Sequence, residues 1–281
     1  IKLSQVGVTS VGNRSVFKSE IIAGKLYAGS SEIIKDAKLK LEMSSDTIGF
    51  NLKTNPVDEF LGEANLNGKA TAFSDRIELN INPSTFIIKD DKYRLFSYYP
   101  IQYTNNGLLL AKDVLIQNGT QQLMFNSDYN GTTNNAHLET QNIDLEKVTS
   151  YIGLKDIQLQ GRVNATINAT DIWGNTVVNG TARTVDYFRL NNDTLGAADI
   201  SFDYSKEKNI LTINEGSKIE NDVAYVFTKG QLDFNKKGLD LTADLKNTPI
   251  SFANQYVNEL VDSLHGTATG MVKVTGDFSN P

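Results

Sequence analysis

The side chains that could do chemistry are few and scattered along the chain. Its two histidines, His137 and His265, lie in or beside alternating stretches without further ligands nearby, so we interpret both as surface residues rather than metal ligands. The motif S-x-x-K occurs at Ser15–Lys18 and Ser205–Lys208, but the second falls in a polar hairpin and lacks the helix that an acylating serine requires. Because the chain has no cysteine, disulfides, thiol chemistry and cysteine-ligated zinc are excluded.

Acidic and aromatic side chains do not form a catalytic pattern either. Asp90-Asp91 and the pair Asp199 and Asp203 fall in turns or on the wet face of strands, where solvation explains them. No phosphate-binding loop or dinucleotide fingerprint follows any strand. We therefore expect no enzyme, no cofactor and no metal. Four aromatic residues that could stack on sugars keep carbohydrate binding open as an alternative: Tyr98, Tyr99, Tyr103 and Trp173.

The composition is that of a folded protein without a nucleic-acid surface. With 281 residues, 40% of them hydrophobic, the chain could bury one large core or two ordinary ones. Its net charge of −6 comes from interspersed charges, so we expect no nucleic-acid partner. No apolar run approaches the roughly 18 residues of a membrane helix. Because residue 1 is Ile and no leader pattern precedes the first strand, we expect a segment of a longer protein whose anchor lies elsewhere.

Alternation of apolar and polar residues runs through almost the whole chain and predicts strands with one wet face. It is clear at Lys38–Met43, Glu78–Ile81, Ile200–Tyr204 and Leu239–Leu245. The longest such stretch, Ile157–Thr170, predicts a single strand of roughly 45 Å. The fold class is therefore all-β, with long antiparallel strands.

Asn-Gly pairs predict the reversals between strands. Asn106-Gly107, Asn118-Gly119 and Asn130-Gly131 are spaced twelve residues apart, and this pair best tolerates the positive φ angles of a type I′ turn. We expect an antiparallel meander there. Asn179-Gly180 fits either another turn or the interior of a strand.

Two short amphipathic helices are expected between strands. Asp144 can cap a helix whose apolar residues include Leu145, Val148 and Ile152, before Gly153. A second helix is expected from a cap at Ser251 to the region just before Gly266, with its apolar residues on one face: Ala253, Val257, Leu260 or Val261, and Leu264.

The chain contains an internal repeat with an offset of 105 residues. Leu159–Asn175 aligns with Leu264–Asn280 without gaps, and upstream Ala136–Tyr151 aligns with Ala243–Tyr256 after a slip of two residues. We predict three parts. Residues 1–143 hold weakly defined repeats, 144–249 one full repeat of a short helix and antiparallel strands, and 250–281 the helix and first strand of the next.

The apolar side of the long strands is built partly from small residues, namely Gly161, Ala165, Ala169, Gly266, Ala268 and Gly270. Small side chains leave space where two packed sheets need bulky ones. A curved sheet with such a face forms a trough that fits acyl chains or an amphipathic strand. A closed sandwich, in which the small residues only ease curvature, stays open as an alternative.

The repeated pattern resembles the TamB family of the translocation and assembly module, related to the AsmA-like bridge proteins. The family's pattern is a short helix, a long glycine-containing strand and a closing Asn-Pro. The strand and the closing pair are Gly266–Gly276 with Asn280-Pro281 here, and Gly161–Asp171 matches the strand more loosely. Leu190–Ile213 is similar to the family's unit of turn, Leu-Gly, strand, loop and strand. The resemblance covers Ala136–Pro281. Residues 1–135 share only the general pattern of alternating strands.

The resemblance implies a periplasmic β-taco, a U-shaped sheet whose hydrophobic groove carries phospholipid acyl chains between the inner and outer membranes. It implies an inner-membrane anchor and a BamA-like outer-membrane barrel as partners of other regions, and a helix near Tyr256–Leu264 that seals or gates the groove. The groove lining carried over by position is Val163, Ala165, Ile167, Ala169, Leu239, Leu241, Ala243, Leu245, Ala268, Gly270, Val272 and Val274. The alternatives are a periplasmic scaffold or chaperone for outer-membrane proteins, and a β-sandwich that binds surfaces or carbohydrate.

Overall fold

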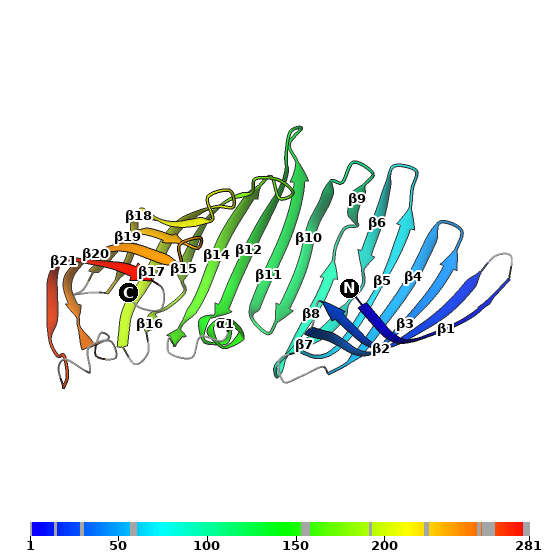
Figure 1. Ribbon diagram of the computed structural model, residues 1–281, viewed down its shortest axis with the longest axis horizontal. Helices are drawn as coiled ribbons and strands as arrows, with labels where there is room; N and C mark the ends of the chain where they lie inside the picture. Colours follow the sequence, from blue (N-terminus) through cyan, green and yellow to red (C-terminus); the bar gives the residue numbers. More distant parts are fainter. Residues whose placement is uncertain are drawn as a thin grey trace. The chain divides into compact units, whose positions relative to one another are not determined.

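The structure, a computed structural model, describes residues 2–13, 16–28, 31–56, 61–152, 158–190, 193–221, 225–251, 254 and 262–277. Its strands form one antiparallel sheet of 21 strands with a single short helix among the described residues (Figure 1). The all-β antiparallel prediction is confirmed. The chain divides into two compact units, Ile1–Asn134 and Asn135–Pro281, which are described separately.

In the first unit, five long strands follow one another and each pairs with the next. They are β1 (Lys2–Gly12), β2 (Phe17–Ala28), β3 (Ser31–Ser44), β4 (Thr47–Asn55) and β5 (Leu61–Ala72). On its other side β5 pairs with two shorter strands. β6 (Arg76–Ile81) and β7 (Ser84–Ile88) pair with different parts of β5. β9 (Ile101–Thr104) then pairs with β6, and β8 (Asp91–Ser97) with β7. Both lead to β10 (Leu109–Asn118), which pairs with β11 (Gln121–Tyr129).

The second unit contains the helix and the remaining strands. Its main ladder runs through β12 (Asn134–Asp144), β14 (Arg162–Thr170), β15 (Val177–Thr184), β17 (Asp193–Ser205), β18 (Ile210–Glu220), β19 (Tyr225–Asp233), β20 (Gly238–Pro249) and β21 (Thr267–Asp277). A short side ladder joins β13 (Leu159–Gln160) to β16 (Phe188–Leu190) and to the start of β17.

Helix α1 (Leu145–Ile152) confirms the first predicted helix. The Oδ1 atom of Asp144 accepts a hydrogen bond of 3.0 Å from the amide of Glu146, which satisfies one of the amides left unpaired at a helix start. Most of the second predicted helix falls on 252, 253 and 255–261, which lie outside the described residues.

The three Asn-Gly reversals are present, but the predicted turn type is wrong. Only the glycine of each pair has a positive φ, at 78° in Gly107, 57° in Gly119 and 94° in Gly131, whereas a type I′ turn requires two such residues. Asn130 instead accepts hydrogen bonds at Oδ1 from the amides of the two threonines that follow Gly131. The side chain of Asn130 therefore braces its own turn, whereas that of Asn118 donates to the carbonyl of Lys92 on β8. Asn179-Gly180 lies inside β15.

The prediction of one strand over Ile157–Thr170 is also wrong. The chain breaks at Gly161 into β13 and β14, which pair with different strands. Gly161 has a φ of 125°, and a Cβ atom there would lie 2.2 Å from the carbonyl oxygen of Tyr187. Only glycine fits this close approach of two backbone segments. Ile157 itself lies outside the described residues.

Equivalent backbone hydrogen bonds occur 105 residues apart, at the same offset as the sequence repeat. The amide of Leu145 donates to the carbonyl of Gly161 at 3.0 Å, and the amide of Ile250 donates to the carbonyl of Gly266 at 3.1 Å. Both glycines have a positive φ. Upstream of α1 the offset is the same, because Leu138 lies opposite Ile167 and Ala243 lies opposite Val272, so the predicted slip of two residues is wrong.

Bulges recur at the same offset. Asn142 and Asn247 each lie in a bulge with a φ of 53° and 50°. Their amides donate to the side-chain oxygens of Asn164 at 2.8 Å and Thr269 at 3.0 Å on the neighbouring strand. A bulge bends its strand and increases the local twist, and β20 and β21 are visibly bent in Figure 1. The sheet of the second unit is therefore curved at repeated bulges, and a hydrogen bond to a side chain of the neighbouring strand holds each of these two bulges.

The most deeply buried side chains of the described residues are small hydroxyls at these irregular places. Ser84, Ser217 and Thr248 are each only 1% exposed. The Oγ of Ser217 accepts from the amide of Ser201 at 3.0 Å and donates to its carbonyl at 3.2 Å, and the Oγ1 of Thr248 donates to the carbonyl of Tyr225 at 2.7 Å. Hydroxyls here replace ladder bonds that the bulges interrupt.

We predict that Gly161 and Gly266 differ in their tolerance of a side chain. Gly161→Ala introduces both a strained φ and a backbone clash, so it should lower the free energy of unfolding by more than about 3 kcal/mol. Gly266 has a φ of 102° but no atom within 4 Å of the added Cβ, so Gly266→Ala should cost about 1–2 kcal/mol. Urea unfolding followed by circular dichroism measures both, and equal losses would contradict this account of the break.

Candidate functional site: an open apolar face

The candidate site is one continuous face of the main ladder in the second unit. Strand register places apolar residues or glycine opposite one another on eight neighbouring strands. This central row consists of Leu138, Ile167, Gly180, Phe202, Ile213, Gly230, Leu241 and Val274. Side chains alternate between faces along a strand, so all of these positions share one side. We call this side the apolar face.

Two further rows flank the central row on the same face. One consists of Ala136, Ala169, Val178, Tyr204, Leu211, Leu232, Leu239 and Gly276. The other is interrupted by bulges and contains Thr140, Ala165, Ala182 and Ile200, then Thr228, Ala243 and Val272. The apolar face thus extends over three rows and eight strands.

On the opposite side of the same ladder, the row next to the central one is polar on all eight strands. The row beside the central one consists of His137, Asn168, Asn179, Asp203, Thr212, Gln231, Asp240 and Thr275. The Nδ1 of His137 lies 2.5 Å from the Oδ1 of Asn168, and its Nε2 lies 2.9 Å from Glu139. His137 is therefore part of a surface hydrogen-bond network. This separation of apolar and polar rows is the expected signature of a sheet with two different environments.

The side chains of the apolar face are partly occluded but not covered. In β14, the face residues Val163, Ala165 and Ile167 are half-buried while the alternate Asn164 and Thr166 are exposed. Towards the edge the face opens further, with Val272 at 43% and Val274 at 39% exposure. Among all described residues, only five hydrophobic side chains are less than 9% exposed: Ala23, Ala111, Val114, Leu115 and Leu195.

The exposed area of the chain supports the same conclusion. The chain exposes 17113 Å² for a mass of 31.0 kDa. Even two separate compact proteins of half this mass would together expose only about 14,000 Å². The excess fits sheets that lack a second layer.

The structure places all twelve predicted lining residues on this one face. Four lie on β14, four on β20 and four on β21. β20 and β21 are adjacent, but β14 is separated from β20 by β15, β17, β18 and β19. The sequence analysis missed the residues between these groups, including Phe202, Ile213 and Leu232. Their signal was the alternation along their own strands, which the offset of 105 residues does not repeat.

The small residues of the face differ in what surrounds them. At Gly266 and Gly270 an added Cβ would meet no atom of the described residues within 4 Å, so these residues leave space at both glycines. At Gly180 an added Cβ would lie 2.5 Å from Cζ of Phe202, so the aromatic ring covers this glycine. Phe50 covers Gly68 in the first unit in the same way, at 2.4 Å. An aromatic ring across a strand glycine fills the place of the missing side chain.

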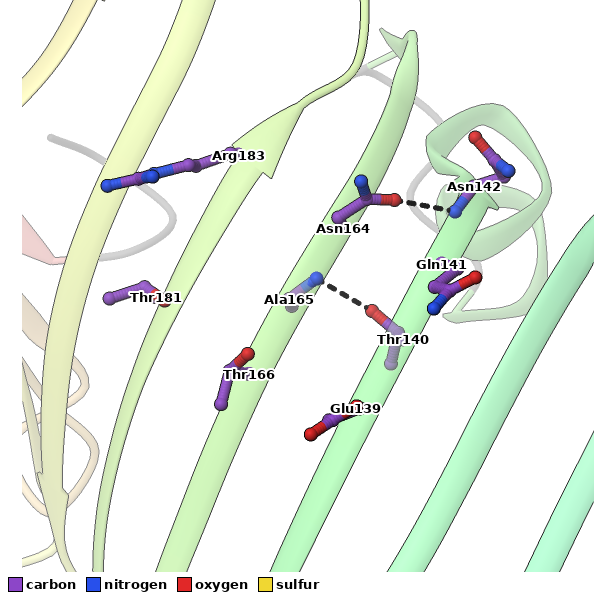
Figure 2. A pocket seen from close by; sticks show the side chains of 9 residues that line it. All are labelled: Glu139, Thr140, Gln141, Asn142, Asn164, Ala165, Thr166, Thr181 and Arg183. Carbon is purple, nitrogen blue, oxygen red and sulfur yellow. Dashed lines mark hydrogen bonds between the residues drawn. The ribbon is translucent and has the colours of Figure 1, made fainter.

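A polar hollow of about 450 Å³ lies beside the bulge of β12 (Figure 2). Its walls come from β12, β14 and β15, where Thr140 accepts a hydrogen bond from the amide of Ala165 at 2.9 Å. Arg183 at its rim forms an exposed ion pair of 3.0 Å with Asp199. Apart from Ala165, the lining is otherwise amide, hydroxyl and carboxylate groups, so this hollow is a poor match for an apolar ligand.

A larger hollow of about 710 Å³ lies in the first unit. Five neighbouring strands, β1 to β5, contribute to its lining together with Asn82. The lining combines the apolar Leu41 and Phe50 with the charged Lys18 and Glu42, whose ion pair of 3.3 Å is well exposed. Lining drawn from so many neighbouring strands is typical of a curved sheet.

Ion pairing rather than burial accounts for the two shifted pKa values. The hydrogen bond with Glu78 raises the pKa of Arg76, and that with Glu220 raises the pKa of Lys218. Neither residue lines the polar hollow. The described residues contain no group of three or more His, Asp or Glu that could hold a metal ion.

The aromatic residues considered for sugar stacking are exposed. Tyr98 is 67%, Tyr99 47% and Tyr103 52% exposed in the first unit, and Trp173 is 60% exposed in the second. Lys112 lies 4.6 Å from the ring centre of Tyr99. Tyr98 packs edge-on against Phe96. These contacts are local and leave the carbohydrate alternative as a hypothesis.

Comparison with known proteins gave no match, whether to protein-family models, to curated proteins or to solved structures. Within the described ranges, no helix has the length and apolar character needed to cross a membrane.

We predict that the native protein binds a hydrophobic dye on the apolar face. Ile167→Asp and Leu241→Asp should each lower the fluorescence of bound anilinonaphthalene sulfonate by at least about half, because a charge interrupts the apolar surface. Thr166→Asp is the matched control, since Thr166 is the neighbour of Ile167 on the exposed polar side. Equal loss in all three variants would show that the dye binds elsewhere.

Proposed function

We propose that the apolar face holds the acyl chains of phospholipids and that the chain is a non-enzymatic segment of a lipid-carrying bridge like those of the TamB family. The observation that carries this proposal is the apolar face of eight strands, over which the described residues of the second unit place no second sheet. A sheet that is apolar on one side must cover that side with something. An acyl chain supplies this cover.

The dimensions and chemistry of the face fit such a ligand. Eight strands spaced about 4.8 Å apart span about 34 Å, comparable to the roughly 30 Å hydrocarbon core of a bilayer. Each methylene group that leaves water contributes about 0.8 kcal/mol when fully buried. The three rows offer mostly methyl, methylene and ring surface, so they favour binding by hydrophobic contact rather than by recognition of a polar group.

The resemblance to TamB supplies the proposed setting. In that setting the segment lies in the periplasm, and an inner-membrane anchor and a BamA-like outer-membrane barrel belong to other parts of the protein. The family's role in outer-membrane biogenesis then follows from movement of lipid along the face. These statements depend on the resemblance between Ala136–Pro281 and the family's repeat.

A second candidate is a scaffold or chaperone for outer-membrane proteins. The open apolar face favours it as well, because an amphipathic strand presents the same kind of apolar surface as a lipid tail. A closed β-sandwich fits less well, since its core would bury far more apolar side chains than the described residues do.

We predict that lipid is captured in cells by a photocrosslinking amino acid at Ile167 or Leu241. Thr166 and Asp240, their neighbours on the polar side, are the matched controls and should capture at most background lipid. Organic extracts of the purified protein analysed by mass spectrometry should contain phospholipid. Polypeptide adducts at Ile167 and Leu241 with no lipid in the extract would reject the lipid proposal and favour the chaperone.

A further inference from the structure

The hollow of about 710 Å³ in the first unit lies on the polar side of strands β1 to β5. Its lining follows two rows of the strand register. One row is Thr9, Glu20, Lys40, Asn51 and Asn67, and the other is Val11, Lys18, Glu42 and Gly49. Leu41 and Phe50 alternate with these positions along their strands, so their side chains point to the other side of the sheet and their backbone forms part of the floor.

A ladder of asparagine side chains crosses this hollow. The Nδ2 of Asn51 donates to the Oδ1 of Asn65 at 2.8 Å and to the Oδ1 of Asn67 at 2.5 Å, and all three residues are half-buried. Within the described part of the chain, the Oδ1 of Asn51 and the Nδ2 groups of Asn65 and Asn67 bond no other side chain. The ladder therefore holds one amide acceptor beside two amide donors.

A lysine without a carboxylate partner lies beside these amides. Lys40 is exposed and lies opposite Glu20 in the register, but Glu20 pairs with Lys38 instead, at 2.8 Å. The other carboxylate of the lining, Glu42, pairs with Lys18. Lys40 forms no ion pair with any described residue, so its ammonium group is left for an anion.

The surroundings of the hollow are also rich in positive charge. Lys38 lies directly opposite Lys53, and like charges in such a pair destabilise a sheet. Neither Lys53 nor Lys69, which lies opposite Gly49, forms an ion pair with a described residue. An acidic ligand would relieve this repulsion.

We infer that this hollow binds an acidic oligosaccharide, whose carboxylate pairs with Lys40 and whose ring hydroxyls bond the amides of Asn51 and Asn67. A hydroxyl group both donates and accepts, so neighbouring ring hydroxyls match an amide acceptor that lies beside amide donors. The volume falls within the roughly 300–1,000 Å³ of small-ligand sites. The site is in the first unit, so it does not depend on lipid binding to the apolar face of the second.

Titration calorimetry of the full chain with tetragalacturonate, which carries one carboxylate on each sugar ring, tests the assignment. Lys40→Gln should weaken binding at least about 10-fold, because it removes a charge-assisted hydrogen bond. Lys92→Gln is the matched control: Lys92 is an exposed lysine of β8 outside the lining, and its loss should weaken binding less than about 2-fold. Circular dichroism checks that both variants fold.

Two further probes separate the sugar from its charge. Maltotetraose has the hydroxyls without the carboxylates, and tetraglutamate has the carboxylates without the sugar rings, so each should bind at least about 10-fold more weakly than tetragalacturonate. Tetraglutamate that binds as tightly would show recognition of charge alone and would overturn the inference. Absence of tetragalacturonate binding, or equal weakening by Lys40→Gln and Lys92→Gln, would overturn it as well.

Discussion

The antiparallel ladder of backbone hydrogen bonds is the constraint on which the rest of the structure depends. Few apolar side chains are fully buried among the described residues, so the strands are held mainly by their neighbours within the sheet rather than by a core between layers. At several bulges that interrupt the ladder, a hydroxyl or amide side chain takes the place of the missing bond, as Ser217 does for Ser201 and Asn164 does for Asn142. The fold therefore keeps its backbone satisfied while one face stays open.

Much of this fold could be predicted from sequence because its main signal is local. Alternation with period two located the strands, Asp144 marked the start of α1, and the asparagine-glycine pairs located three reversals. Which residues of each strand face the apolar side also followed, since period two assigns each residue of a strand to one side of the sheet. The twelve expected lining residues share a face for this reason.

The remaining features depend on contacts between distant segments, which local patterns do not contain. The break at Gly161 depends on the carbonyl of Tyr187, which approaches from β16 and its preceding turn. The bulges at Asn142 and Asn247 depend on side chains of the next strand, and their shared offset was hidden by an alignment that placed a gap upstream. Phe202 and Leu232 belong to strands that the repeat offset does not duplicate, so alternation placed them on one side of their own strands without joining them to the site.

The central claim is that the apolar face is covered by a lipid tail rather than by protein. Methyl NMR with a protonated fatty acid and an otherwise deuterated, methyl-labelled protein tests it directly, because intermolecular nuclear Overhauser effects arise only between groups in close contact. The account predicts such effects between the acyl chain and the methyl groups of Ile167, Ile213 and Leu241, and none at Thr166 and Thr181 on the polar side. Effects of equal strength on both sides, or none, would contradict it.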